Sequence, residues 1–220
     1  MKKKIRFLFI FIICLISLGY INIKANKLPL FGKIIYLDPG HGGLDPGTVY
    51  KDIYEKDINL DICIKLQKEL ESKGATVYLT RYDDYDLSSP KARMRKNSDL
   101  NNRVRLINDS KADLYVSIHL NSINSNSWHG AQVFFDDVNE KNKEFATIMQ
   151  NELKKDLGTD RKIEEISNML LNRKVIIPGA LIEVGFLSND NERYLLRQDD
   201  YQLKIAKAVT KGVLRYFESL

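Results

Sequence analysis

Short β-rich runs alternate with helical stripes along most of this chain, and that alternation limits the folds open to it. Residues 33–37 form a compact β-rich run that ends at Asp38-Pro39-Gly40, and a second run follows at 75–80. Between them apolar residues recur at every fourth position, which predicts an amphipathic helix over 55–73; they are Ile58, Ile62, Leu66 and Leu70. A strand, a helix and a strand in this order predict two parallel strands joined by a helical crossover.

The same alternation continues to the end of the sequence. The further expected elements are a helix around 100–107, strands at 114–118 and 131–135, a helix at 139–157, a short strand at 169–171, a buried strand at 180–184 and one or two helices over 190–217. Polar stretches at 81–98 and 121–128 predict loops. This order predicts an α/β domain over 28–220 with three layers, in which helices cover both faces of a mostly parallel or mixed central sheet.

The first 27 residues have the pattern of a targeting segment. Lys2, Lys3, Lys4 and Arg6 form a basic head, and a nearly unbroken apolar run follows from Phe7 to Ile23. A basic head before an apolar run is typical of a secretion signal. The run is also about long enough to span a bilayer, which takes ~20 residues. We therefore expect export, either secreted or with an uncleaved membrane anchor in the cell envelope.

The formal net charge of +5 comes from this leader. Six of the 34 basic residues and none of the 29 acidic residues lie in 1–27, so the rest of the chain carries 28 basic residues against 29 acidic ones. That balance argues against nucleic acid as a partner. Of the two cysteines, Cys14 lies in the leader and Cys63 on a predicted helix, so no disulfide is expected.

Histidines follow two of the predicted strands. The folded part contains His41, His119 and His129. His41 lies in a glycine-rich loop after the first strand, and His119 directly follows the run at 114–118. Because ligands gather at the carboxyl ends of strands in open α/β sheets, His41 and His119 are candidates to converge on one ion.

Two glutamates extend this pattern. Glu55 begins the helix after the glycine-rich loop, and Glu183 interrupts the apolar run at 180–184, where an unpartnered carboxylate is costly to bury. Two histidines and one glutamate form a known catalytic zinc set, and a second glutamate would activate the water. From the residues alone, Asp52 and Asp57 compete with Glu55 as the ligand, and the substrate stays open.

Four segments occur in the order of the signature blocks of a known enzyme family. They are 36–47 (YLDPGHGGLDPG), 55–60 (EKDINL), 112–122 (ADLYVSIHLNS) and 181–189 (LIEVGFLSN). The chain resembles the zinc-dependent N-acetylmuramoyl-L-alanine amidases of the amidase-3 type over residues 33–217. Its compact form with a short leader is similar to the spore-germination amidases of Gram-positive endospore formers.

The resemblance implies a role for each candidate residue. His41, Glu55 and His119 would bind Zn²⁺, and Glu183 would be the catalytic acid and base. The reaction implied is hydrolysis of the amide between N-acetylmuramic acid and L-alanine in peptidoglycan, in spore cortex modification or germination.

Three further residues are candidates for substrate binding. Asn121 lies beside the second histidine block. Arg103 either faces the cleft, as the resemblance implies for an arginine on this helix, or makes a salt bridge on the helix surface. His129 either touches substrate or is a solvated loop residue.

Two other functions remain open at this point. One is a zinc peptidase that cuts within the stem peptide, and the other is a catalytically inactive regulator that binds peptidoglycan. The intact set of four zinc and catalytic residues argues against the inactive form. Only 63 residues separate His119 from Glu183, so we expect no inserted inhibitory helix, and an accessory activator protein is a possible partner.

Overall fold

The computed structural model describes residues 10–13 and 28–220. Of the expected leader, only residues 10–13 fall in the described part, and they are helical; the rest of that prediction lies outside the described residues. Among the helices of the described part, none is long and apolar enough to cross a membrane.

The centre of the domain is a six-stranded sheet with the order β4-β1-β5-β8-β6-β7. Its bounds are β1 Ile34–Pro39, β4 Thr76–Leu79, β5 Leu114–Asn121, β6 Gln132–Phe135, β7 Glu164–Glu165 and β8 Gly179–Phe186. Neighbours among β4, β1, β5 and β8 pair in parallel, whereas β6 is antiparallel to β8 and parallel to β7. The carboxyl ends of the four parallel strands therefore meet at one edge.

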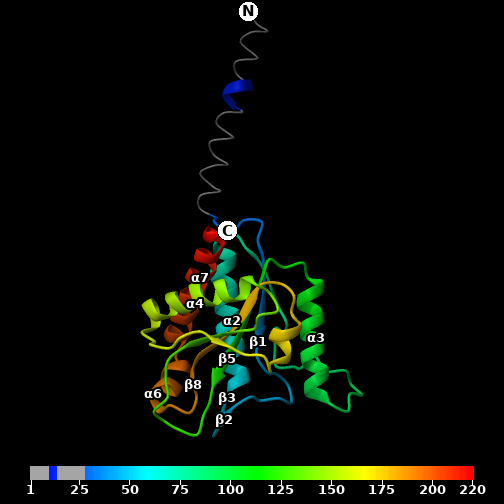
Figure 1. Ribbon diagram of the computed structural model, residues 1–220, viewed down its shortest axis with the longest axis vertical. Helices are drawn as coiled ribbons and strands as arrows, with labels where there is room; N and C mark the ends of the chain where they lie inside the picture. The colour runs from blue at the N-terminus through cyan, green and yellow to red at the C-terminus, as the bar shows by residue number, and fades with distance from the viewer. Residues whose placement is uncertain (1–9, 14–27) are drawn as a thin grey trace, which may run out of the picture.

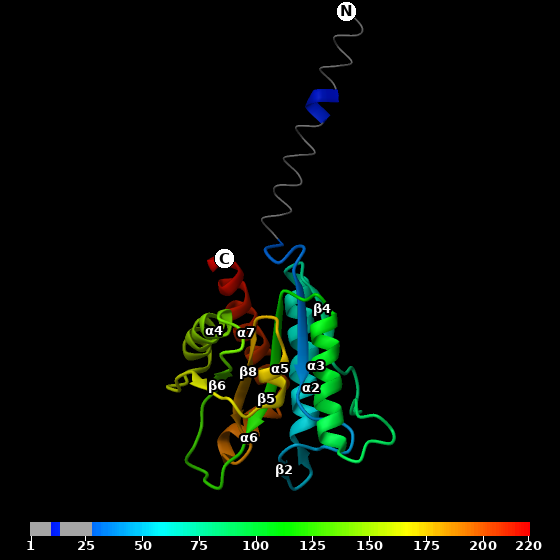
Figure 2. The ribbon, with the colours of Figure 1, turned by 45° about the vertical axis from the view of Figure 1, so that its right-hand side comes forward.

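Helices cover both faces of this sheet, which confirms the predicted three-layer α/β fold. One face packs against α2 (Glu55–Ser72), α4 (Lys141–Leu157) and α7 (Asp199–Ser219). The other face packs against α3 (Arg95–Asp109) and the short α5 (Leu170–Lys174). Figures 1 and 2 show the sheet between these groups, with α3 on the opposite side of the domain from α4. Helix α6 (Asp190–Leu196) follows β8.

Most of the expected elements are present, with one error. The predicted strand at 169–171 is wrong, because this segment leads into α5, where Leu171 and Val175 pack four residues apart against Tyr36 and Tyr115. The sequence reasoning also missed a small hairpin within the glycine-rich stretch, formed by β2 (Val49–Tyr50) and β3 (Ile53–Tyr54), and the two-residue β7.

The two faces of the sheet carry different side chains, because successive residues of a strand point to opposite faces. In β5 the apolar set packs in the main core with α2, α4 and α7; it comprises Leu114, Val116, Ile118 and Leu120. The alternate residues Ser117 and His119 point to the side of α3. In β8, Ile182 and Val184 join the main core, which leaves Glu183 on the α3 side.

A buried ion pair fixes α3 to the end of β1. Arg103 Nη1 lies 2.8 Å from Asp38 Oδ1, and the two side chains are 1% and 2% exposed. The hydroxyls of Thr80 and Ser117 each donate to Asp38 at 2.7 Å. Burial alone would raise the pKa of Asp38, but the Arg103 charge and these hydrogen bonds outweigh it and lower the pKa to about 2. Asp38 is therefore a permanent anion within the domain.

Replacing Arg103 with methionine should strongly destabilise the domain. The substitution leaves Asp38 buried without its cation, and breaking such a pair typically costs about 3–5 kcal/mol. Urea unfolding of the variant and the wild type measures this change. The matched control is Arg95→Met in the same helix, because Arg95 is 45% exposed and pairs with Asp86 at the surface; there we expect about 1 kcal/mol or less. Equal losses in the two variants would contradict the assignment.

The pair should also make stability fall in acid. The pKa of Asp38 is ~3.9 in the unfolded chain and about 2 in the fold. At a pH between these two values, the unfolded state binds a proton at Asp38 and the folded state does not. The free energy of unfolding attributable to Asp38 is thus fully present above about pH 4 and is lost as the pH falls towards 2. Asp38→Asn should show a shallower decline over this range in unfolding titrations; parallel curves would refute the linkage.

Candidate metal centre and active site

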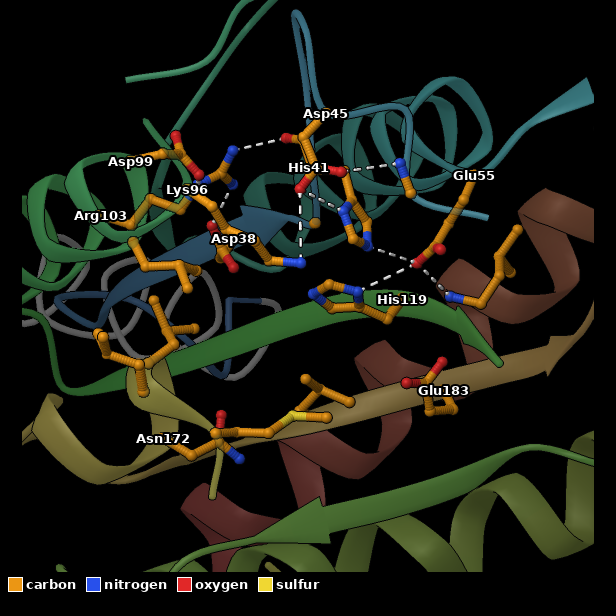
Figure 3. A pocket seen from close by; sticks show the side chains of 18 of the residues that line it. Asp38, His41, Asp45, Glu55, Lys96, Asp99, Arg103, His119, Asn172 and Glu183 are labelled. Atoms are coloured by element: carbon orange, nitrogen blue, oxygen red, sulfur yellow. Dashed lines mark hydrogen bonds and ion pairs between the residues drawn. The ribbon is translucent and has the colours of Figure 1, made fainter. Parts of the chain in front are cut away.

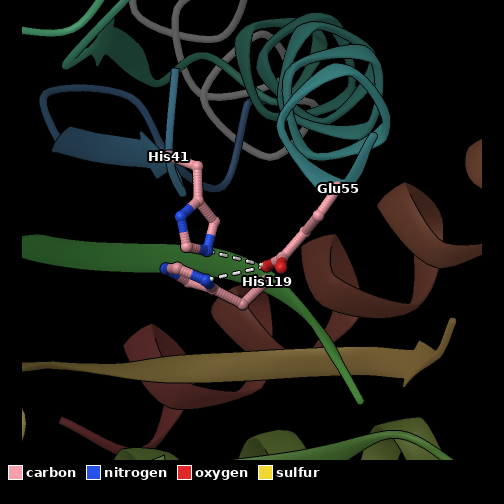
Figure 4. A group of neighbouring side chains, drawn as sticks. All are labelled: His41, Glu55 and His119. Carbon is pink, nitrogen blue, oxygen red and sulfur yellow. Dashed lines mark hydrogen bonds and ion pairs between the residues drawn. The ribbon is translucent and has the colours of Figure 1, made fainter. Parts of the chain in front are cut away.

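Three side chains converge at the carboxyl ends of β1 and β5, as Figure 4 shows. His41 Nε2 lies 3.2 Å from Glu55 Oε1, and His119 Nδ1 lies 3.1 Å from the same oxygen. One ligand atom from each of the three residues lies within 4.8 Å of the other two. The residues that the sequence analysis singled out as ligands therefore form a cluster that could hold one metal ion.

The surrounding carboxylates favour a cation at this point. Asp45 Oδ2 lies 2.9 Å from His41 Nδ1, on the side of the ring away from Glu55. Burial would lower the pKa of His41, but the hydrogen bonds to Asp45 and Glu55 outweigh it and raise the pKa to about 9. The same negative groups that favour a proton on this imidazole favour a metal cation beside it. A carboxylate on the second ring nitrogen also fixes the tautomer and orientation of a ligating histidine.

Glu55 is held in place by backbone donors at the first residue of α2. It is 3% exposed. The backbone N–H of Leu120 donates to its Oε1 at 3.1 Å, and that of Thr48 donates to its Oε2 at 2.8 Å. Burial would raise the pKa of Glu55, but the hydrogen bonds and charges of His119 and His41 outweigh it and lower this pKa well below the usual range. The alternatives Asp52 and Asp57 line a separate surface pocket, so the structure brings Glu55, and neither of them, to the histidines.

Two glycines of the loop leave the space that the cluster occupies. A Cβ atom on Gly40 would lie 2.3 Å from the His119 ring, and one on Gly47 would lie 2.6 Å from Glu55 Oε2. Gly47 also has a φ of 66°, which side chains rarely adopt. His41 has a φ of 63°, and Arg103 Nη2 donates to its carbonyl oxygen. Contacts from outside the loop therefore hold His41 in an uncommon conformation.

Glu183 faces the same space from the neighbouring strand. It pairs with His119 in the parallel register of β5 and β8, so the two side chains share a face of the sheet. It is 8% exposed, and its Oε2 has no hydrogen-bond partner among the described residues. Burial, with the charge of Glu55 adding to it, raises the pKa of Glu183 to about 8. A carboxyl group tuned in this way can take up and release a proton near neutral pH.

These groups open into a cavity of about 750 Å³, shown in Figure 3. Its lining includes the three cluster residues, Glu183 and Asn121, together with parts of α3 and α5. Asn121 thus lies where substrate contact is possible. His129 is exposed in a loop and is not part of this lining. Substrate binding by either residue stays a prediction.

Arg103 forms an ion pair with Asp99 four residues earlier in its own helix, with 2.9 Å between Nε and Oδ2, but this pair is buried and does not lie on the helix surface. Its side chain is 1% exposed. Its nitrogens donate to the carboxylates of Asp38 and Asp99 and to the backbone oxygens of Pro39 and His41. Although Arg103 lines the cavity, these contacts fix the loop that carries His41. The structure thus gives it a positioning role, and direct substrate binding stays a prediction.

The sequence analysis missed Arg81, because it placed this residue at the start of a polar loop over 81–98 and gave it no role. The side chain is 1% exposed and donates to the backbone oxygens of Pro39, Gly40 and Lys56. Like Arg103, it therefore braces the loop that carries His41. The one sequence signal for this role is that Arg81 directly follows the β-rich run at 75–80. Hydrophobic periodicity does not distinguish a buried arginine that supports a loop from a solvent-exposed one.

Comparisons with known proteins agree with this geometry. The Amidase_3 family model, described as N-acetylmuramoyl-L-alanine amidase, matches residues 35–215. A relative from Bacillus subtilis (strain 168), described as a germination-specific N-acetylmuramoyl-L-alanine amidase, is 44% identical over 99% of this chain and 97% of its own.

Solved structures give the same result. The CwlD amidase from Clostridioides difficile, solved in complex with the GerS lipoprotein, has a TM-score of 0.82 and 40% identity over 86% of this chain and 100% of that one. The catalytic domain of CwlV, an N-acetylmuramoyl-L-alanine amidase from Bacillus (Paenibacillus) polymyxa var. colistinus, has a TM-score of 0.74 and 32% identity over 84% of this chain and 98% of its own. The predicted family, fold and enzyme class are confirmed: the chain belongs to the amidase-3 family of N-acetylmuramoyl-L-alanine amidases.

Proposed function

We propose that this amidase is a zinc enzyme that releases the stem peptide from the glycan of peptidoglycan, with spore cortex as its site of action. The observation that supports the proposal is that His41, Glu55 and His119 line one cavity with Glu183. Within the described part of the chain, Glu183 Oε2 has no hydrogen-bond partner. The high identity to a germination-specific relative supports the role in the cortex.

The donor set fits zinc. Two imidazoles and one carboxylate with a fourth position open to solvent are a common catalytic zinc site. When bound, the ion supplies Lewis acidity, which lowers the pKa of the attacking water and polarises the scissile carbonyl. His41, Glu55 and His119 would hold the ion, and Asp45 would orient the His41 ring through its Nδ1.

Glu183 would move the proton. Its free Oε2 accepts a proton as water attacks the carbonyl carbon, and the same atom then protonates the departing amine of L-alanine. Both steps need a carboxyl group that is neither permanently ionised nor permanently neutral, and burial gives Glu183 that property.

We also infer that the protein works outside the cytoplasm with help from a second protein. The leader pattern in residues 1–27 supports export. A CwlD amidase has been solved in complex with a lipoprotein, which supports an accessory protein as a partner here. Peptidoglycan is the substrate that fits the family.

Glu183→Gln should lower kcat by ~10²–10⁴-fold, because general acid–base catalysis contributes about that factor. Bound zinc, measured by elemental analysis, should stay stoichiometric since Glu183 is not among the cluster residues. Product masses from purified muropeptides identify the bond cut. Free stem peptides that begin at L-alanine support the amidase, whereas cuts within the stem would establish the zinc peptidase. Full activity of the variant would refute the role of Glu183.

His119→Ala should lose both bound zinc and activity, because only two of the three ligands remain. The matched control is His129→Ala, which removes a histidine that is exposed and outside the cavity lining; this variant should keep its zinc. Titration with a competing zinc chelator compares the two affinities. Loss of zinc from both variants, or from neither, would contradict the proposed ligand set.

A further inference from the structure

The side-chain amide of Asn172 is fully buried and makes no hydrogen bond to any described residue. Its side chain is 0% exposed, and both the oxygen and the nitrogen of its amide lack a hydrogen-bond partner among the described residues. An asparagine amide offers two donors and an acceptor with two lone pairs. Burying these groups without hydrogen bonds costs free energy, so a buried amide of this kind needs a specific explanation.

The position of Asn172 supplies that reason. Asn172 lies in α5 and lines the same cavity as Glu183 and the metal cluster. Figure 3 shows it along β8 from Glu183, below His119. The floor between them includes Leu181, which lies two residues before Glu183 on the same face of β8. Asn172 and the cluster residues thus line one cavity.

The helix that carries Asn172 is anchored on both sides of it. Leu171 and Val175 are buried against Tyr36 and Tyr115 in the core on this face. At the end of α5, the carbonyl oxygen of Lys174 accepts a hydrogen bond from Asn108 Nδ2 at 2.9 Å. The amide is therefore held at a fixed depth beside the cavity, which favours a recognition role over a side chain free to turn into solvent.

We propose that Asn172 is a specificity-determining residue that hydrogen-bonds a backbone amide of the stem peptide while the scissile amide lies at His41, Glu55 and His119. This inference rests on the proposed amidase function and assigns one arm of the cavity to the peptide. A peptide bond presents one donor and one acceptor side by side, and a primary amide complements both.

The lining near Asn172 suits a peptide better than a glycan. Leu100, Met169 and Leu170 line this part of the cavity, and apolar walls complement alanine methyl groups rather than sugar hydroxyls. Lys96 also belongs to the lining; its side chain is 70% exposed and its Nζ lies 4.0 Å from Asp45. This partly free cation at the rim complements the carboxylates of a stem peptide.

Because Asn172 is 0% exposed, a peptide reaches its amide only when neighbouring side chains of the cavity move, and Met169 is an adaptable neighbour in this lining. Met169 is the N-cap of α5 and lies three residues before Asn172, so the two share a face of the helix. Its side chain is 38% exposed and unbranched, and such a thioether changes rotamer readily.

The test compares the full-length wild type with Asn172→Leu on two muropeptides, one with a four-residue stem and one whose stem is L-alanine alone. The short substrate lacks the peptide bonds beyond L-alanine. Two hydrogen bonds of ordinary strength predict a loss of about 10- to 100-fold in kcat/KM on the long stem, mainly through KM. On the short stem the two proteins should be within about twofold, and Asn172→Gln should recover part of the loss.

A second readout does not depend on turnover. The free four-residue stem peptide is titrated into the Glu183→Gln protein while the side-chain amide resonances of Asn172 are followed by NMR. We expect these resonances to shift, and Asn172→Leu in the same background should bind the peptide about tenfold more weakly. The melting temperature of Asn172→Leu should not fall, because leucine removes the unmade hydrogen bonds. Thr210→Val, which alters a buried hydroxyl bonded to Ala206 in α7, is the matched control and should leave KM unchanged.

Each outcome bears on one idea. Equal kcat/KM for wild type and Asn172→Leu on the long stem, with no shift of the Asn172 resonances, overturns the inference while the amidase stands. An equal loss on both stems assigns Asn172 to the glycan or to folding and also overturns it. If the wild type cuts the long substrate only within the stem, the proposed function fails, and the NMR titration still decides whether Asn172 binds the peptide.

Discussion

The ion pair between Asp38 and Arg103 holds together the edge of the sheet at which the site forms. Asp38 is the penultimate residue of β1, three residues before His41. Arg103 reaches it from α3 and also donates to the carbonyl oxygen of His41. Thr80, directly after β4, and Ser117, in the middle of β5, tie the same carboxylate to the two flanking strands. Because a buried charge pair tolerates little displacement of either partner, this network sets where the histidine loop can lie.

The alternation of side chains along the strands then decides which groups meet. In β5 and β8 every second residue belongs to the main core, and the intervening residues include Ser117, His119 and Glu183. The parallel register places His119 beside Glu183. A strand that is buried on both faces reads as an apolar run. One glutamate within such a run indicates a functional residue on the second face, near the carboxyl end of the strand.

The sequence predicted the three-layer fold and the meeting of His41 with His119, because strand ends in such sheets converge at one edge. The choice of Glu55 over Asp52 and Asp57 needed the family resemblance, since all three lie near the start of one helix. Burial of Arg81 and Arg103 was not predictable from periodicity, because both have partners in a loop far away in sequence, including the backbone oxygen of Pro39. The segment at 169–171 was mistaken for a strand because a short apolar run fits a strand and a helix equally well.

Digestion of purified peptidoglycan by the full-length protein, with zinc and with zinc removed by a chelator, tests the zinc amidase mechanism most directly. Mass spectrometry of the soluble products should show intact stem peptides with a free L-alanine amino terminus in the presence of zinc, and none after chelation until zinc is restored. Undiminished release of these peptides from a demonstrably metal-free protein, or products cut only within the stem, would contradict it.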